Sequence, residues 1–267
     1  MLIDSHCHLD AAEFGNAAAE IAQQAADAGV TWIVIPAVEQ ANFDTVAALA
    51  ARLPQAVYAL GIHPIYVPQA KESDLRLLRE RVAVALHDER FVAIGEIGLD
   101  FFLRDLKQSL LREKQEYFYS EQLKIARDFD LPVILHVRRS QDSLLKYLRR
   151  IPVRGGIAHA FNGSYQQAQQ FIALGFVLGF GGAMTFTRAL QIRRLAAELD
   201  LSSIVLETDA PDISPAWLHP GMNSPVQLAQ ISAVLAELRG QPQAEIAHQT
   251  TENVARVLPR LGSLMMA

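Results

Sequence analysis

Two histidines near the start of the chain have the spacing of a shared metal site. They lie in residues 2–10, LIDSHCHLD, where an apolar strand-like start leads directly into His-x-His. Side chains along a strand point alternately to opposite faces, so we expect His6 and His8 to share a face, with Cα atoms about 6–7 Å apart. Two imidazoles aimed at one point can hold one divalent cation. The same alternation turns Cys7 to the other face, where we expect a small core residue.

Other polar residues stand alone at or near the ends of short apolar segments. They are His63, Glu96, His136, His159 and Asp209. A single histidine at the end of a strand is usually a loop or capping residue. Glu96 by itself could be a buried residue paired with an arginine. Together with His6 and His8, these residues offer more ligands than one tetrahedral ion with an open position needs. This holds even if His63 is not counted as a ligand.

The whole set suits two ions about 3.5–4 Å apart that share a carboxylate. Glu96 is the natural bridge, because its segment is otherwise apolar and an unpaired buried carboxylate would be costly. The remaining histidines, His87, His219 and His248, fall in predicted helices or a proline-rich loop. We expect these three to be structural or solvent-facing.

A scaffold must bring these distant positions to one point. Short apolar segments predict eight strands, at residues 2–10, 31–36, 56–64, 91–100, 131–136, 155–159, 176–182 and 203–211. Helical patterns follow them at residues 20–28, 43–52, 74–87, 110–129, 140–150, 164–174, 187–199 and 225–239, with a last one at 244–258. Strands that alternate with helices pair in parallel through right-handed crossovers. The pattern therefore predicts an α/β fold, a closed (β/α)₈ TIM barrel with its active site at the carboxyl ends of the strands.

Composition limits the class of protein. The 267 residues suit one α/β barrel and contain no evident linker, so we expect a single domain over residues 1–267. Apolar residues make up 51% of the chain, but no apolar run reaches the ~18–20 residues of a membrane span. One cysteine and the absence of an amino-terminal signal pattern favour the cytoplasm. A net charge of −5 argues against clamping long duplex nucleic acid by charge alone.

Motifs along the chain resemble those of the TatD family of metal-dependent deoxyribonucleases, which are amidohydrolase-like TIM barrels. The resemblance spans residues 2–211, in order, and is greatest to the YjjV-type bacterial branch. Its motifs are DSHCHLD at 4–10, GIHP at 61–64, AIGEIGLD at 93–100, PVILH at 132–136, GIAH at 156–159 and LETDAP at 206–211.

The resemblance implies a role for each matching position. The implied metal ligands are His6, His8, Glu96, His136, His159 and Asp209. The first two would hold one ion with Asp209 beside it, His136 and His159 would hold the second, and Glu96 would bridge the pair.

The resemblance also implies residues that bind the substrate. His63 would lie near its phosphate, and Arg138, just past the strand-five histidine, could contact that phosphate. Two segments depart from the family pattern. Many members carry Ser-Arg-Asp where this chain has Val137-Arg138-Arg139, and Arg-Asn-Glu-Pro where it has Met222-Asn223-Ser224-Pro225. These departures bear on substrate preference and leave the metal ligands untouched.

The expected function is metal-dependent hydrolysis of phosphodiester bonds, by a deoxyribonuclease acting on single-stranded or terminal DNA. Two divalent ions, zinc, magnesium or manganese, would activate a water, and Asp209 is the candidate proton acceptor. The alternative is a binuclear metallohydrolase of a small cyclic amide, lactone or other ester, because the same ligands polarise a carbonyl oxygen. Glu96 stands where a binuclear amidase would carry a lysine, and this argues against an amide as the substrate. A third possibility is a barrel without enzymatic activity, which would bind metal but turn over no phosphodiester or ester. We expect DNA or another phosphodiester as the partner, with no membrane and no obligate protein partner.

Overall fold

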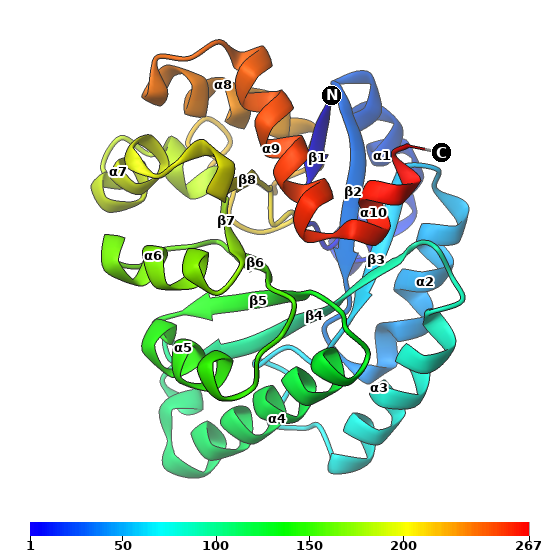
Figure 1. Ribbon diagram of the computed structural model, residues 1–267. Coiled ribbons are helices and arrows are strands. Elements are labelled where there is room, and N and C mark those ends of the chain that lie inside the picture. The colour runs from blue at the N-terminus through cyan, green and yellow to red at the C-terminus, as the bar shows by residue number, and fades with distance from the viewer. Residues whose placement is uncertain (267) are drawn as a thin grey trace.

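The computed structural model describes residues 1–266 and contains one sheet of eight parallel strands in sequence order (Figure 1). The strands are β1 (Leu2–Asp4), β2 (Val30–Pro36), β3 (Ala56–Leu60), β4 (Phe91–Asp100), β5 (Val133–Arg138), β6 (Gly156–His159), β7 (Phe176–Phe180) and β8 (Ile204–Leu206). The two end strands approach each other through the Ser5 N–H, which donates to the Leu206 carbonyl at 3.1 Å, and the Asp209 N–H, which donates to the His6 carbonyl at 2.8 Å. These bonds bring the barrel to closure.

Helices surround the strands, as Figure 1 shows. They are α1 (Ala18–Asp27), α2 (Phe43–Arg52), α3 (Glu72–Ala85), α4 (Ser109–Asp128), α5 (Gln141–Arg150), α6 (Tyr165–Ala173), α7 (Leu190–Glu198), α8 (Leu228–Arg239), α9 (Gln243–Val257) and α10 (Pro259–Leu264). Each strand is followed by a helix, so the prediction of a (β/α)₈ barrel is confirmed. Within residues 1–266, no helix has both the length and the hydropathy to cross a membrane.

The strands are buried on both faces, and their two faces have different neighbours. Alternate residues pack outward against the helices, while the residues between them form a second, inner cluster. The inner cluster includes Ile3, Val34, Val57, Ile134, Ile157, Val177 and Val205. Two positions further along β5, β6 and the chain after β8 stand His136, His159 and Glu207. The two-residue period of a strand therefore stacks polar side chains above an apolar inner layer.

The last two helices close the amino-terminal end of the barrel. Val254, Val257, Leu258 and Leu261 pack against the inner apolar layer. Asn253 donates to the carbonyls of Leu201 and Ile204 at the start of β8, and Arg260 donates to the Phe91 carbonyl at the start of β4. This floor leaves the carboxyl ends of the strands as the open end. Helix α10 was not among the predicted helices.

Several predicted strands are shorter than expected. β3 ends at Leu60 and β7 at Phe180, so His63 follows its strand and does not end it. β1 ends at Asp4, so His6 and His8 follow the strand and do not lie on it. The reason is local, because the Asp4 carboxylate accepts the His6 N–H at 3.3 Å and curls the backbone. β8 likewise ends at Leu206, three residues before Asp209.

Candidate metal centre

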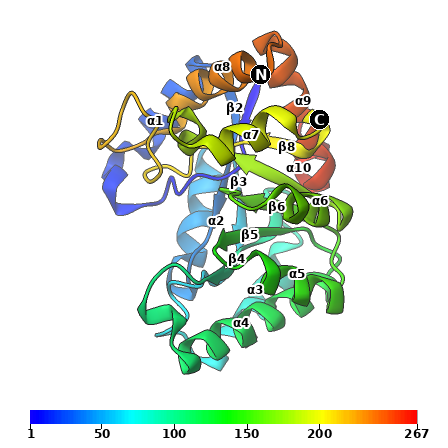
Figure 2. The same ribbon diagram turned by 90° about the vertical axis from the view of Figure 1, so that its left-hand side faces the viewer.

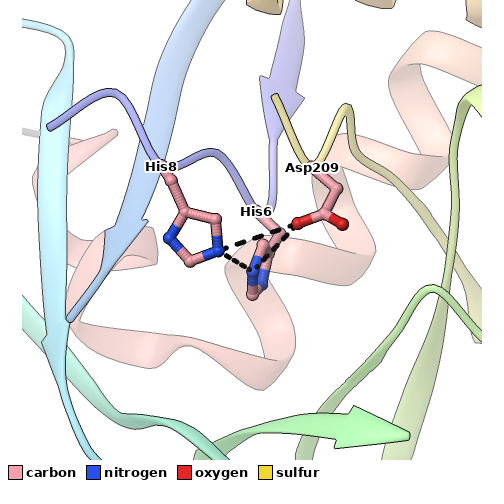
Figure 3. Close-up of side chains that lie close together, drawn as sticks. All are labelled: His6, His8 and Asp209. Atoms are coloured by element: carbon pink, nitrogen blue, oxygen red, sulfur yellow. Dashed lines mark hydrogen bonds and ion pairs between the residues drawn. The ribbon is translucent and has the colours of Figure 1, made fainter. Parts of the chain in front are cut away.

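The segments that follow β1 and β8 bring three predicted ligands together (Figure 3). The Nε2 atoms of His6 and His8 lie 3.3 Å apart. The Oδ1 atom of Asp209 lies 3.5 Å from the first nitrogen and 3.7 Å from the second. The imidazoles converge, as the sequence predicted, although an irregular segment and not a strand face directs them.

Glu96 on β4 lies between two sets of histidines. Its Oε2 atom is 3.1 Å from Nε2 of His6 and 3.4 Å from Nε2 of His8. Its Oε1 atom is 2.9 Å from Nδ1 of His136 and 3.1 Å from Nε2 of His159. The side chain is only 1% exposed. The two carboxylate oxygens therefore face different imidazoles.

His63 joins the same cluster but presents a different edge of its ring. Its Nε2 atom lies 3.3 Å from Oε1 of Glu96 and 3.0 Å from Nδ1 of His136. Its Nδ1 atom accepts the backbone N–H of Ile65 at 3.1 Å. A neutral imidazole that accepts through one nitrogen carries its proton on the other. The geometry thus assigns His63 as a hydrogen-bond donor toward the centre.

Two further carboxylates support histidines of the centre from behind. Oδ2 of Asp100 is 3.2 Å from Nε2 of His136, and Oε1 of Glu207 is 3.5 Å from Nδ1 of His159. The hydrogen bond to Asp100 turns Nε2 of His136 outward and its Nδ1 lone pair toward Glu96, whereas Nδ1 of His159 makes only the longer ion-pair contact with Glu207. Sequence reasoning gave no role to these acids. The signal for Glu207 was its position two residues after inner-facing Val205.

These side chains form the groups of His, Asp and Glu atoms that could hold metal ions. The groups are His6, His8 and Asp209; His6, Glu96 and His159; and His63, Glu96 and His136. All six predicted ligands and His63 thus meet at one end of the barrel. His136 and His159, predicted to share one ion, fall in different groups that have Glu96 in common.

Residues 3–259 match the family described as TatD related DNase. The chain belongs to the TatD related DNase family. A relative from Escherichia coli K12, described as an uncharacterized metal-dependent hydrolase YjjV, is 43% identical over 252 residues, 94% of this chain and 95% of the relative. The crystal structure of YjjV from that bacterium has a TM-score of 0.91 and 41% identity, and it covers 97% of this chain and 98% of that one. Human deoxyribonuclease TATDN3 is 28% identical over 269 residues, 99% of this chain and 97% of its own. The resemblance to the YjjV-type branch is confirmed.

The donor set of this TatD family chain fits divalent cations. Imidazole nitrogens and carboxylate oxygens are ligands for zinc, and carboxylates suit magnesium and manganese. Within residues 1–266, Oε2 of Glu96 is buried and makes no hydrogen bond, although ring nitrogens of His6 and His8 lie 3.1 and 3.4 Å from it. A cluster built only as a polar network in the core would satisfy such atoms. The arrangement of these side chains therefore suits metal coordination better than a network of hydrogen bonds among themselves.

The histidines around Glu96 favour its ionised form. Burial alone would raise the pKa of Glu96, but the histidines packed around it hold that pKa well below its usual range. Burial opposes protonation of His8, yet the hydrogen bond and charge of Glu96 raise its pKa to about 9. Burial raises the pKa of Asp209 to about 6, against the charges of nearby histidines. Burial also lowers the pKa of His63 to about 4, which keeps that ring neutral.

Arg138 lies at the rim of the TatD family centre and not inside it. The side chain, at the end of β5, is 46% exposed. Its Nη1 atom is 3.7 Å from Oδ2 of Asp100, and its guanidinium carbon lies 4.1 Å from the ring centroid of Phe102. Arg139, one of the departures from the family pattern, also packs on this ring at 4.8 Å. The structure thus places two arginines on one aromatic ring at the rim.

Proposed function

We propose that the chain is a metal-dependent hydrolase that cleaves phosphodiester bonds, as a deoxyribonuclease acting on single-stranded or terminal DNA. The family match and the relatives' names support the reaction class. The ligands of two divalent ions would be His6, His8, Glu96, His136, His159 and Asp209. When bound, the ions would polarise the phosphoryl group and offset its developing negative charge. Histidine-rich ligands favour zinc by affinity, whereas phosphodiester chemistry often uses magnesium or manganese.

One observation carries this proposal. The two oxygens of Glu96 face separate sets of histidines. Oε2 faces His6 and His8, at 3.1 and 3.4 Å, and Oε1 faces His136, His159 and His63, at 2.9, 3.1 and 3.3 Å. A carboxylate so placed suits two adjacent cations that share it. An acid that served only to neutralise a buried charge would need a single cationic partner.

His63 would bind the substrate and not a metal ion. A metal ligand needs a free lone pair on the nitrogen that faces the ion. Nδ1 of His63 already accepts the Ile65 N–H, so Nε2 carries the proton and can donate it to a phosphoryl oxygen. This donor would strengthen as negative charge develops on that oxygen.

Asp209 would accept the proton during hydrolysis. A water oxygen forms a bond to phosphorus, the bond from phosphorus to the leaving sugar oxygen breaks, and one water proton passes to a carboxylate oxygen of Asp209. The leaving oxygen takes a proton from solvent. The position of Asp209, 14% exposed and 3.5 Å from the nearest ring nitrogen, supports this role.

Arg138 would hold a phosphate oxygen at the rim. Its guanidinium is half exposed and close to Asp100, which itself contacts His136. An arginine can bind phosphate through two parallel hydrogen bonds, which fixes orientation as well as position. The net charge of −5 fits a short contact of this kind better than a long duplex clamp.

The test replaces the bridging carboxylate. We expect Glu96→Ala to lose bound metal and to abolish cleavage of single-stranded DNA and bis-p-nitrophenyl phosphate. Metal content is measured by elemental analysis of protein purified without added metal, and cleavage is measured with and without chelator. The matched control is Glu198→Ala, an exposed glutamate of α7 that pairs with Arg194, which should keep both properties.

Other outcomes separate the alternatives. A Glu96→Ala variant as active as the wild type would refute the bridging role. Wild-type turnover of simple amides or lactones with none on phosphodiesters would favour the alternative hydrolase. Bound metal without turnover of any substrate would favour a non-enzymatic barrel.

A further inference from the structure

A large cavity opens beside the metal centre and takes no part in the mechanism above. Its volume is about 790 Å³, within the range of small-molecule sites. Its walls come from three segments that follow β1, β7 and β8, and they include Glu13, Phe186, Arg188, Asp212, Ile213 and Met222. Figure 2 shows the blue segment after β1 and the gold segment after β8 extending from the same side of the barrel.

The cavity and the centre share one piece of backbone. The N–H of Asp212, in the cavity wall, donates to the carbonyl of Asp209 at 2.8 Å. The N–H of His8 donates to the carbonyl of Ala210, also at 2.8 Å. The turn that presents Asp209 to the centre therefore continues directly into the cavity.

The apolar walls suit a flat aromatic group. Ile213 and Met222 are large apolar side chains left 37% and 49% exposed, and Phe186 is partly exposed beside them. Exposed apolar side chains gathered in a hollow mark a binding site more often than chance. An aromatic side chain of this kind can stack on a nucleobase.

The charged walls favour a base over a phosphate. Glu13 and Asp212 are exposed carboxylates that line the cavity. Its other polar walls include Arg188 and His219, which both pack on Phe186, the guanidinium carbon 5.4 Å and the imidazole centroid 5.5 Å from the ring centroid. Two carboxylates repel a phosphate. They accept hydrogen bonds from exocyclic amino groups, as acidic side chains do from cytosine N4.

We propose that this cavity is a nucleobase subsite, which holds the base next to the scissile phosphate and prefers bases with an exocyclic amino group over thymine. The proposal rests on the phosphodiesterase function proposed above and names the substrate group that the site recognises. Phe186 and Met222 supply stacking and apolar contact, and Glu13 and Asp212 supply the preference for an amino group.

The first experiment compares oligodeoxynucleotides of one length. Their residues next to the cleaved bond are cytosine, thymine or an abasic sugar, and kcat/KM is measured for each. We expect cytosine to exceed the abasic sugar by about fivefold to hundredfold, the range for one base stacked on an aromatic ring. Thymine should lie between the two. A ratio near one between cytosine and the abasic sugar would overturn the subsite, and equal values for cytosine and thymine would overturn the amino preference.

Variants identify the walls responsible. Phe186→Ala should bring the ratio of cytosine to abasic sugar close to one, and Glu13→Gln should remove the difference between cytosine and thymine. The matched control for the first is Tyr117→Ala, an exposed aromatic of α4, which should keep the wild-type ratios. Unchanged ratios in both cavity variants would assign the selectivity to another surface.

A binding measurement separates this proposal from the reaction. Calorimetry on the metal-loaded protein compares deoxycytidine 5′-monophosphate with deoxyribose 5-phosphate. Tighter binding of the nucleotide, lost in Phe186→Ala, supports the subsite even if no phosphodiester is cleaved, in which case only the proposed reaction fails. Equal binding of the two probes overturns the subsite, whatever the protein cleaves.

Discussion

Asp100 determines which nitrogen of His136 faces the centre. One carboxylate oxygen of Asp100 accepts the backbone N–H groups of Phe102 and Leu103, at 2.8 and 3.0 Å. The other lies 3.2 Å from Nε2 of His136. An acid that accepts from the outer nitrogen of a ligand histidine fixes its tautomer and raises its basicity.

We therefore expect Asp100→Asn to weaken metal binding by about 10- to 100-fold. The asparagine oxygen can keep the two backbone bonds, but its amide then turns an N–H toward Nε2 of His136. The ring would have to move its proton to Nδ1 and lose the inward lone pair. Competition with a chelator measures the affinity. Asp128→Asn, at an exposed carboxylate paired with Arg79, is the control, and an equal loss in both variants would contradict the mechanism.

Nε2 of His63 lies 3.0 Å from Nδ1 of His136. Replacing these two histidines should nevertheless have different effects on metal content. We expect His63→Ala to keep the full metal content and to lose about 100- to 1,000-fold in kcat, the cost of one donor to a developing negative charge. His136→Ala should lose metal, because its inner nitrogen is a ligand in the proposal. Elemental analysis beside turnover of bis-p-nitrophenyl phosphate makes the comparison. A metal-depleted His63→Ala protein would show that His63 is a ligand as well.

At the scale of elements, the sequence predicted what depends on short-range periodicity. Short apolar segments identified all eight strands, and their alternation with helical patterns identified the barrel. His136 and His159 were predicted at the ends of such segments, and the structure places each of them two residues beyond an inner apolar side chain, Ile134 and Ile157.

Long-range contacts were beyond such patterns. The Asp4 carboxylate accepts the N–H and hydroxyl of Thr208, at 3.0 and 2.6 Å, and so ties β1 to the segment that carries Asp209. Gln122 on α4 both accepts the N–H and donates to the carbonyl of Ile62, and so holds the segment of His63. Both pairs join distant residues whose contact no local pattern reveals. Helix α10 was also missed, because its six residues are too few to show a helical period and it is held by Leu261, which packs against the inner apolar layer.

We expect contacts in the floor of the barrel to affect the stability of the fold and to leave the metal affinity of the centre unchanged. Asn253 is 1% exposed and donates to two buried carbonyls, of Leu201 and Ile204, at 2.7 Å each. We expect Asn253→Ala to lower the free energy of unfolding by about 2–4 kcal/mol, because both carbonyls lose their donor. Urea unfolding measures the loss, with exposed Glu252→Ala on the same helix as control. Metal affinity should not change, since the floor lies at the opposite end, and a large fall in affinity would refute this separation.

For the whole molecule, the centre should make stability depend on metal. Buried acids and imidazoles converge there, and a ligand that binds only the folded state stabilises it by mass action. We expect free metal at about 100 times its dissociation constant to add about 2.7 kcal/mol to the free energy of unfolding. Thermal unfolding with chelator and with added metal measures the difference. Glu96→Gln should abolish this difference. If metal does not change the thermal unfolding midpoint of the wild-type protein, that result would contradict a buried metal site.

The overall charge predicts how salt affects DNA cleavage. With a net charge of −5, we expect the protein to attract phosphates mainly where cations gather near the site, at the centre and at Arg138 and Arg139. Each phosphate neutralised on a single strand contributes about −0.7 to the slope of log affinity against log salt. Contact with about two or three phosphates gives a slope of about −1.4 to −2.1, and this slope should not steepen as oligonucleotides grow beyond a few residues. KM measured over a range of salt and length tests both points. A slope that keeps steepening with length would require an extended cationic track, which the composition of the chain argues against.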